Sequence, residues 1–370
     1  MSKVLQNGES LSEEELRDLR SCVECRACEK VCPSKMPYLD LLNSTREKSP
    51  DNPTSPLVRG LLFSTAKQNR LRQLFRMLRV YQKTGFQSFI DASGLLKVTK
   101  FERLHRMLPK LSSYQKFEAY YPSLTATQGS VGLFTGCLTD VMQNSVLHAA
   151  IKVLTHLGYD VHIPRRQQCC GAIHANNGDA DTAESLAAEN ISTFNALDID
   201  AILFTASACG TSLMRYANSP LDEQMQNLSG FESKLIDVNE FIADADWPER
   251  LKMRPLKKRV FVHEPCSQQY PAAAHKSAYE FLQSIPSVEL EPLPENNICC
   301  GAGGTYMLTH PEASEKIRDI KLEHLKEGQA EILVTSNIGC ALHLAAGIKG
   351  DGLEVEVLHP VELLARHIAL

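Results

Sequence analysis

Residues 167–179 read QQCCGAIHANNGD, and residues 297–312 read NICCGAGGTYMLTHPE. Each stretch carries a Cys-Cys-Gly turn, with one cysteine well before it and another well after it. The offsets between corresponding cysteines are 129, 130 and 131 residues, so one folding unit has been duplicated. The two sets of four are Cys137, Cys169, Cys170 and Cys209, and Cys266, Cys299, Cys300 and Cys340.

The residues around these cysteines repeat as well. VGLFTGC (131–137) matches VFVHEPC (260–266), and AILFTASACG (201–210) matches EILVTSNIGC (331–340). Short apolar runs predict buried strands, and longer amphipathic stretches between them predict helices, which indicates α/β units on parallel sheets. Because sites in such sheets gather at the carboxyl ends of strands, we expect each repeat to bring its four thiols together. The predicted strands are 131–135, 159–163, 200–205, 259–263, 288–292 and 332–335, and the predicted helices are 142–157, 180–197, 273–283 and 313–327.

Composition narrows the class of protein. The chain has 370 residues, 43% hydrophobic and 22% charged, with a net charge of −5 and twelve cysteines. It holds no apolar run near the roughly 20 residues of a membrane-spanning helix, and its start has no apolar signal-peptide core. Twelve cysteines without an export signal indicate metal binding or reactivity rather than disulfides. The mild acidity gives no case for binding nucleic acid.

The paired-cysteine repeats offer four soft ligands each, which favours iron–sulfur clusters or zinc over hard cations. A single buried cysteine often serves only as an apolar core residue, but eight cysteines at matching positions of two repeats do not fit that role. His174 and His263 lie beside the cysteine turns, and we expect them to hydrogen-bond near the ligands rather than to bind metal themselves. His343 follows Cys340 by three residues, whereas Ser212 holds that place in the first repeat.

A third set of cysteines stands near the start, in SCVECRACEKVCPS (21–34). Its spacing, C-x2-C-x2-C-x3-C-P, is that of bacterial ferredoxins, in which the fourth cysteine ligates the other cluster of a pair. Only one copy of the motif is present, so the first three thiolates need a fourth ligand, either Cys32 or a thiolate from elsewhere. The cluster-binding set is Cys22, Cys25, Cys28 and Cys32.

Between this motif and the first repeat lies a basic region. Residues 59–116 hold 13 Lys or Arg and 2 acidic residues, a net +11, which leaves −16 for the rest of the chain. Apolar residues such as Leu74, Phe75 and Leu78 recur at helical spacing and predict amphipathic helices. Two interpretations stay open: a basic face for an anionic membrane surface or an acidic partner, and a solvated connector.

Taken together, CVECRACEKVCPS, CCGAIH, HEPC, CCGAGGTYMLTHPE and ILVTSNIGC resemble the iron–sulfur subunit of bacterial glycolate oxidase, over nearly the whole chain. The resemblance implies an electron-transfer subunit that binds no substrate itself. It would take electrons from a flavin-binding partner that oxidises a 2-hydroxy acid, glycolate or D-lactate, and pass them toward the respiratory chain. It implies a 4Fe–4S cluster at the ferredoxin-like motif and a second cluster or zinc at the repeats, in a cytoplasmic protein that contacts the inner membrane peripherally.

We expect four domains: a ferredoxin-like segment (1–50), a basic helical linker (51–128) and two cysteine-rich domains (129–255 and 256–370). The sequence departs from the family pattern in having one ferredoxin motif where two are usual, and we expect Met1 to align with an internal methionine of longer members. Neither repeat ends in the C-x-x-C of heterodisulfide reductases. Related lactate, glycerol-3-phosphate or heterodisulfide oxidoreductase subunits are the alternatives, together with a zinc-stabilised assembly protein and a thiol–disulfide reductase.

Overall fold

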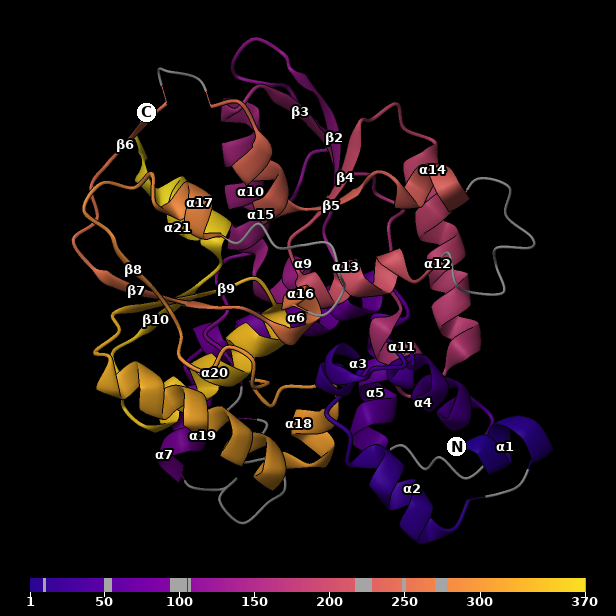
Figure 1. The fold of residues 1–370 in the computed structure, drawn as a ribbon. Helices are drawn as coiled ribbons and strands as arrows, with labels where there is room; N and C mark the ends of the chain where they lie inside the picture. The colour runs from indigo at the N-terminus through magenta and orange to yellow at the C-terminus, as the bar shows by residue number, and fades with distance from the viewer. Residues whose placement is uncertain are drawn as a thin grey trace.

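Two parallel β-sheets, each flanked by helices, form the body of the molecule (Figure 1). The computed structural model describes residues 1–8, 11–49, 55–93, 105, 108–216, 228–247, 251–269 and 278–369. The predicted α/β class, with two parallel-sheet units preceded by helical segments, is confirmed.

The first sheet has the strand order β1-β3-β2-β4-β5, in which only β1 runs antiparallel to its neighbour. All residues of β4 and the last four of β2 are buried, as expected for parallel strands covered by helices on both faces. Helix α10 (Asn144–His156) covers one face and α12 (Ala180–Asn195) the other. The strands are β1 (Tyr120–Tyr121), β2 (Gly129–Phe134), β3 (Tyr159–His162), β4 (Ala201–Phe204) and β5 (Leu235–Asp237).

The second sheet is fully parallel, in the order β10-β9-β7-β8. Helices α19 (Pro311–Glu327) and α20 (Ile338–Gly350) cover one of its faces, where Phe261 and Leu333 are buried. Its strands are β7 (Arg259–His263), β8 (Glu289–Pro292), β9 (Ile332–Thr335) and β10 (Glu356–Leu358), and β6 (Lys252–Met253) pairs separately with β11 (Ile368–Ala369).

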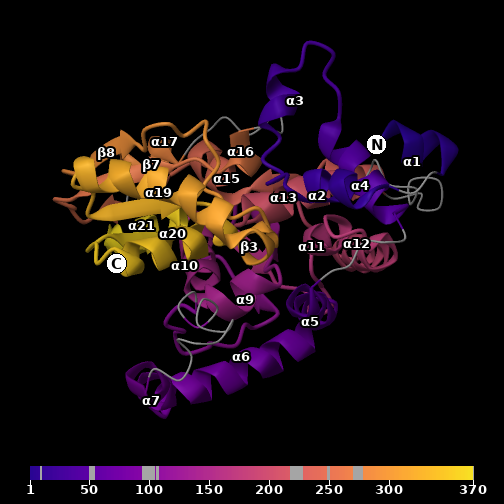
Figure 2. The same cartoon turned by 90° about the horizontal axis from the view of Figure 1, so that it is seen from below.

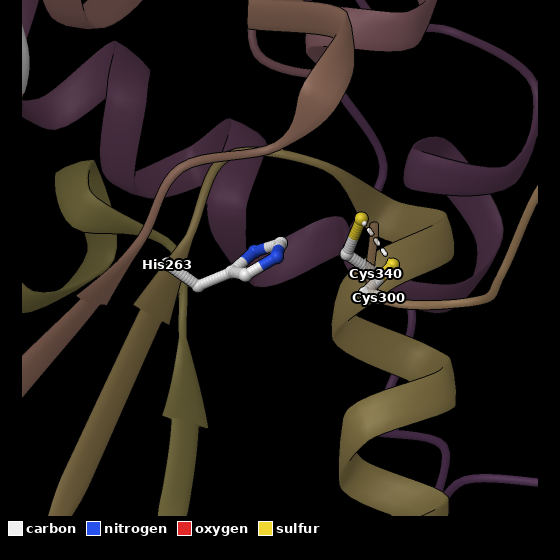
Figure 3. Close-up of side chains that lie close together, drawn as sticks. All are labelled: His263, Cys300 and Cys340. Atoms are coloured by element: carbon white, nitrogen blue, oxygen red, sulfur yellow. Dashed lines mark hydrogen bonds between the residues drawn. The ribbon is translucent and has the colours of Figure 1, made fainter. Parts of the chain in front are cut away.

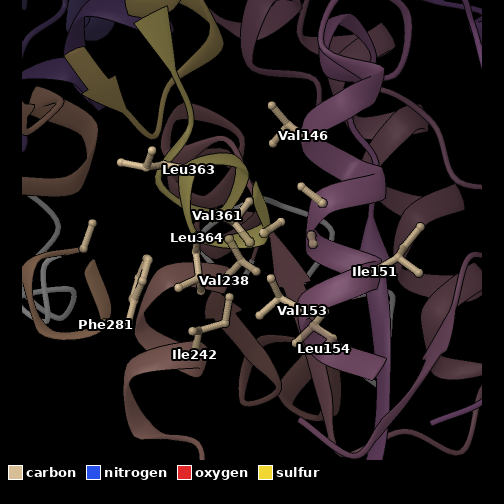
Figure 4. Close-up of a cluster of buried hydrophobic side chains, with 14 of the residues drawn as sticks. Val146, Ile151, Val153, Leu154, Val238, Ile242, Phe281, Val361, Leu363 and Leu364 are labelled. Carbon is tan, nitrogen blue, oxygen red and sulfur yellow. The ribbon is translucent and has the colours of Figure 1, made fainter. Parts of the chain in front are cut away.

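The inner faces of the two sheets share one hydrophobic core (Figure 4). Helix α10 of the first unit packs against α21 (Pro360–His367) of the second, and the Lys152 ammonium donates a hydrogen bond to the Ala365 carbonyl at 2.8 Å. Val131 and Val334, from strands of different sheets, belong to the same buried cluster. The shared core fixes the two cysteine-bearing sheet edges relative to each other. The smaller helices of the two units are α9 (Leu138–Met142), α11 (Ala172–Ala175), α13 (Ser207–Met214), α14 (Leu228–Glu232), α15 (Val238–Asp244), α16 (Cys266–Gln269), α17 (Tyr279–Leu282) and α18 (Tyr306–Thr309).

Within the described ranges, seven helices precede the sheets. Ser12 and Glu15 form a capping box at the start of α2, and Pro56 takes the first turn of α5 behind the Ser55 cap. Figure 2 shows α6 and α7 along the bottom of the molecule, away from α3 at the top. The helices are α1 (Ser2–Asn7), α2 (Glu13–Arg20), α3 (Ala27–Val31), α4 (Tyr38–Glu47), α5 (Pro56–Thr65), α6 (Gln68–Lys83) and α7 (Phe86–Ser93).

The predicted strands and most predicted helices of the repeats are confirmed, with ends that match or differ by at most two residues. Residues 270–277, where the helix over 273–283 was expected to begin, lie outside the described residues, and α17 forms the end of that stretch. Part of the expected bend at 51–57 and most of residues 94–107 also lie outside them. Strand β5 was not predicted, because three residues are too short a run for periodicity to detect.

Candidate metal centres

The first cysteine quartet gathers at the carboxyl ends of neighbouring strands. Cys137 follows β2, Cys169 and Cys170 follow β3, and Cys209 lies in α13 just after β4. The Sγ atoms of Cys169 and Cys137 are 3.3 Å apart, and Cys170 interacts with both Cys169 and Cys209. Gly136, one residue before Cys137, adopts φ +65°, a backbone conformation that favours glycine. The structure therefore brings together all four thiols of the first repeat.

The second quartet is built in the same way. Cys266 begins α16 after β7, Cys299 and Cys300 follow β8, and Cys340 lies in α20 after β9. The Sγ atoms of Cys300 and Cys340 are 2.9 Å apart, and Cys299 interacts with Cys266 and Cys300. All twelve cysteines of the chain are free.

An amide side chain ties each cysteine turn to the end of a neighbouring strand, β2 in the first repeat and β7 in the second. In the first repeat Gln167 accepts from the Thr135 N–H at 2.8 Å and donates to the Leu133 carbonyl at 3.2 Å. In the second, Asn296 accepts from the Glu264 N–H at 3.1 Å and donates to the Val262 carbonyl at 2.9 Å. The two repeats therefore share this pair of hydrogen bonds, although the amide belongs to Gln167 in the first and to Asn296 in the second.

Each quartet stabilises one thiolate. Hydrogen bonds from Cys169 and Cys209 hold the pKa of Cys170 well below its ordinary value, and hydrogen bonds from Cys266 and Cys300 do the same for the pKa of Cys299. The thiol that donates such a hydrogen bond shows the opposite effect: donation to Cys170 raises the pKa of Cys209 well above its ordinary value. Because the thiolate is the metal-binding form of cysteine, such a site is prepared for a soft metal.

The histidines near the quartets differ in role. His174 is buried, with Nδ1 at 2.8 Å from the Asp179 carboxylate and Nε2 at 3.2 Å from the Thr65 hydroxyl, so both ring nitrogens are engaged by other groups. His343 contacts Ser314 through Nε2 at 3.0 Å, while its buried Nδ1 has no hydrogen-bond partner among the described residues.

His263 was likewise expected only to hydrogen-bond near the ligands, but the structure places it beside two thiols of the second quartet. Its Nδ1 contacts the Thr335 hydroxyl at 2.9 Å, and its imidazole points toward two thiols of the second quartet (Figure 3). One ring nitrogen and the sulfurs of Cys300 and Cys340 all lie within 4.8 Å of one another. Burial, reinforced by the charge of Lys321, lowers the pKa of His263 to about 3, so the ring is neutral and able to coordinate.

The ferredoxin-like motif lies against the second quartet. Negative charge at Cys299, Cys22 and Cys28 acts on Cys25, whose pKa is raised chiefly by burial. A Cβ on Gly303, three residues after Cys300, would lie 2.8 Å from the carbonyl oxygen of Val23. Cys32 lies beyond α3, at the C-terminal cap of that helix. Cys22 and Cys25 thus share one loop and Cys28 lies in the first turn of α3, with Cys299 from the second quartet acting on Cys25.

Buried ion pairs hold this loop in its conformation. Glu24 and Arg26 both adopt positive φ, near +60°, which is costly for residues other than glycine. The carboxylate of Glu24 pairs with Arg46, which also donates to the carbonyls of Asn176 at 2.8 Å and Leu19 at 3.0 Å. Arg46 therefore links the loop, α2 and the first cysteine turn.

Two functional positions were missed in the sequence. Asn190 donates to the Cys169 carbonyl at 3.0 Å and accepts from the Gln168 N–H at 2.8 Å, beneath the first turn. Lys321 occupies the corresponding helix position beneath the second turn and is fully buried. The signal that could have found Lys321 was a lysine on the apolar face of α19, next to the buried Leu322.

The donor set fits a soft metal or an iron–sulfur cluster. Each repeat presents four convergent thiols, with one favoured as thiolate and no carboxylate among them. Backbone N–H groups add to this: that of Gly301 donates to Cys299 Sγ at 3.4 Å, and that of Glu24 to Cys22 Sγ at 3.4 Å. N–H donors of this kind stabilise sulfur ligands that carry negative charge.

Comparison with known proteins agrees with this geometry. The model of a cysteine-rich domain matches residues 131–214 and 260–345, and the model of the linker region of the glycolate oxidase iron–sulfur subunit matches residues 55–112. A probable glycolate oxidase iron–sulfur subunit of Bacillus subtilis is 32% identical over 94% of this chain and 82% of its own length. The glycolate oxidase iron–sulfur subunit of Escherichia coli is 28% identical over 93% of this chain and 82% of its length. Lactate utilization protein A of a Geobacillus species is 28% identical over 63% of this chain and 98% of its length. This chain belongs to the family of glycolate oxidase iron–sulfur subunits.

Proposed function

We propose that this chain is the electron-transfer subunit of a flavin-dependent 2-hydroxy acid dehydrogenase, and that a flavin-binding partner oxidises glycolate or D-lactate. The observation that carries the proposal is the packing of the ferredoxin-like loop on the second cysteine turn, where a Cβ on Gly303 would lie 2.8 Å from the Val23 carbonyl oxygen. Negative charge at Cys299 acts on Cys25 there. The names of the relatives, glycolate oxidase subunits and lactate utilization protein A, support this substrate class. The chain itself binds no substrate and delivers electrons toward the respiratory chain.

In this proposal the ferredoxin-like cysteines hold a 4Fe–4S cluster and each repeat quartet holds a second iron–sulfur centre or zinc. Bound clusters supply one-electron transfer between neighbouring centres. The chain's own residues set the distance: Gly303 admits Val23 to the second cysteine turn, and Arg46 fixes the loop from the other side. We retain domain boundaries of 1–50, 51–128, 129–255 and 256–370 as part of the proposal.

Anaerobic purification with counts of iron, acid-labile sulfide and zinc, followed by electron paramagnetic resonance after dithionite, tests the proposal. We expect iron and sulfide in cluster proportions and a reducible signal that Cys25→Ser weakens. Val31→Ser is the matched control, because Val31 lies in the same segment and is 78% exposed. A colourless protein with stoichiometric zinc and no sulfide would establish the zinc-stabilised assembly protein instead.

We also propose that helices α5 to α7 contact the inner face of the cytoplasmic membrane. The outward side of α6 carries Met77 and Val80, 64% and 56% exposed, and α7 presents Phe86 and Phe89, 53% and 61% exposed, with their rings stacked 5.9 Å apart. Helix α6 also carries the exposed Arg76, and the guanidinium of Arg70 lies 4.1 Å above the ring of Phe63. Apolar side chains ringed by cations match an anionic lipid surface. In the part of the chain that the structure describes, no helix is long and apolar enough to cross a membrane.

Sedimentation with phosphatidylglycerol vesicles, compared with phosphatidylcholine vesicles, tests this contact. We expect salt-sensitive binding to the anionic vesicles that Phe86→Ser with Phe89→Ser abolishes. Leu124→Ser is the control, because Leu124 is 62% exposed and lies outside α5 to α7. If wild-type protein ignores anionic vesicles but the purified flavin-binding subunit covers this face, the face is a protein interface and the membrane proposal is wrong.

A further inference from the structure

The two cysteine repeats differ in charge at one buried position. Lys321 follows Asn190 by 131 residues, the same offset that relates Cys340 to Cys209. The packing confirms the correspondence, since a Cβ on Gly171 would contact Ala183 and a Cβ on Gly301 would contact Ser314, and these contact residues are also 131 apart. The first repeat therefore has a neutral amide where the second has an amine.

The contacts of the two side chains are different in kind. Asn190 is satisfied by neutral partners: the Cys169 carbonyl, the Gln168 N–H and the Tyr216 hydroxyl at 3.2 Å. The ammonium of Lys321 donates to the Glu295 carbonyl oxygen. Among the described residues, no carboxylate oxygen lies within ion-pair distance of its Nζ.

The negative groups that act on Lys321 are mostly those of the second quartet. Burial lowers the pKa of Lys321, and negative charge at Cys300, Glu295, Cys299 and Cys340 opposes that change. A fully buried ammonium is costly unless an opposite charge compensates it. Four thiolates that ligate a cluster supply that charge, whereas the first quartet has no cation at the corresponding position.

A second substitution points the same way. His263 follows Phe134 by 129 residues, the offset that relates Cys266 to Cys137. The first repeat thus places a phenyl ring at the strand end where the second places an imidazole facing Cys300 and Cys340. The lysine makes the surroundings of the second quartet more positive, and the neutral imidazole makes them more polar.

We propose that Lys321 is the counter-charge of the second cysteine quartet, and that it makes the centre held there more readily reduced than the centre of the first quartet. A fixed positive charge at short range in a medium of low dielectric constant favours the state that carries the extra electron. This inference rests on the proposed electron-transfer function. The more positive potential of the second centre would direct electrons toward the quartet that lies beside the ferredoxin-like loop.

Redox titration of anaerobically purified protein, monitored by electron paramagnetic resonance, tests the inference. Cys209→Ser and Cys340→Ser assign the signals of the first and second centres. We expect the second centre to have the more positive midpoint potential, and Lys321→Gln to shift that centre alone to more negative potential. Lys321→Arg, which keeps the charge, should retain most of the wild-type value. Lys316→Gln, which removes an exposed charge from the same helix, should change nothing.

The outcomes separate the two proposals. Wild-type protein with no reducible centre at the repeats overturns both the electron-transfer function and the role of Lys321. A reducible second centre whose potential is the same in Lys321→Gln and Lys316→Gln overturns the role of Lys321 alone. If Lys321→Gln lowers cluster content, the midpoint potential is measured on the fraction of protein that retains its clusters, and that value decides the role of Lys321. If Lys321→Arg also loses the second centre, Lys321 acts through packing and its proposed role as a counter-charge is wrong.

Discussion

Replacing Arg46 with methionine should release the ferredoxin-like segment from the body of the protein. The side chains of Arg46 and Glu24 are 10% and 12% exposed, and Arg46 also holds the carbonyls of Asn176 and Leu19. Methionine preserves most of the apolar volume but leaves the Glu24 carboxylate buried without its cation. Breaking a buried pair in this way costs about 3–5 kcal/mol.

That cost corresponds to a roughly 10²- to 10⁴-fold increase in the local opening equilibrium, at about 1.4 kcal/mol per factor of ten. Amide hydrogen exchange of residues 11–49, followed by mass spectrometry, measures it. The control is Arg17→Met, because Arg17 and Glu14 form an ion pair at 3.8 Å with side chains 74% and 80% exposed. Exposed pairs of this kind contribute about 0–1 kcal/mol, so exchange should barely change.

The pH dependence gives a second test of the same argument. Burial already raises the pKa of Glu24, and Arg46 opposes this rise. Without Arg46, the pKa of Glu24 in the folded state rises further above its value in the unfolded state. The loss of stability in Arg46→Met is therefore complete at a pH above the folded-state pKa of Glu24. This loss of stability disappears as the pH falls toward the unfolded-state pKa of Glu24, because the buried carboxyl group is then protonated. At neutral pH, the double variant Arg46→Met with Glu24→Gln should recover much of the lost stability. Exchange in Arg46→Met equal to that in Arg17→Met would refute the reasoning.

Three further predictions concern single side chains. Gly301→Ala should destabilise the fold by about 2–4 kcal/mol in thermal denaturation, because it adds a Cβ at φ +87° only 2.4 Å from the Ser314 carbonyl oxygen. Gly171→Ala, whose Cβ would have its nearest contact at 3.2 Å, should cost only about 1–2 kcal/mol. Equal losses of stability in the two variants would contradict this prediction. Gly303→Ala should speed hydrogen exchange in residues 22–28 by pushing Val23 away, whereas Gly304→Ala, also at positive φ but with no atom of the described residues within 4 Å, should not. Burial raises the pKa of Asp237 to about 7, so the wild-type protein should gain stability as the pH falls from about 7 toward the unfolded value near 4; denaturant titrations of Asp237→Asn should lack this pH dependence.

Much of the fold and of the candidate site was predictable because the evidence is local. Strands such as β4 and β9 are short, largely apolar runs that stand five residues before a cysteine. Parallel strands must also end at one edge of a sheet. Those two facts are enough to place four thiols together in each repeat. The spacing within residues 22–32 likewise indicates the kind of centre without any long-range contact.

Which centre lies beside which was decided only by the tertiary structure. The approach of Cys25 to Cys299 depends on the positive φ of Glu24 and Arg26 and on an ion pair between residues 22 positions apart. The amphipathic pattern of α6 was visible in the sequence, but the exposure of Met77 opposite the buried Leu71 was not.

The sequence by itself determined that this chain carries two copies of one cysteine-bearing α/β unit and a ferredoxin-like motif, because repeats, periodicity and ligand spacing are properties of neighbouring residues. Only the tertiary structure decided that the two copies are electrostatically unequal. Periodicity tells which face of α19 is apolar, but it does not tell that Lys321 on that face is fully buried beneath the second quartet, since burial depends on what the rest of the fold places against it.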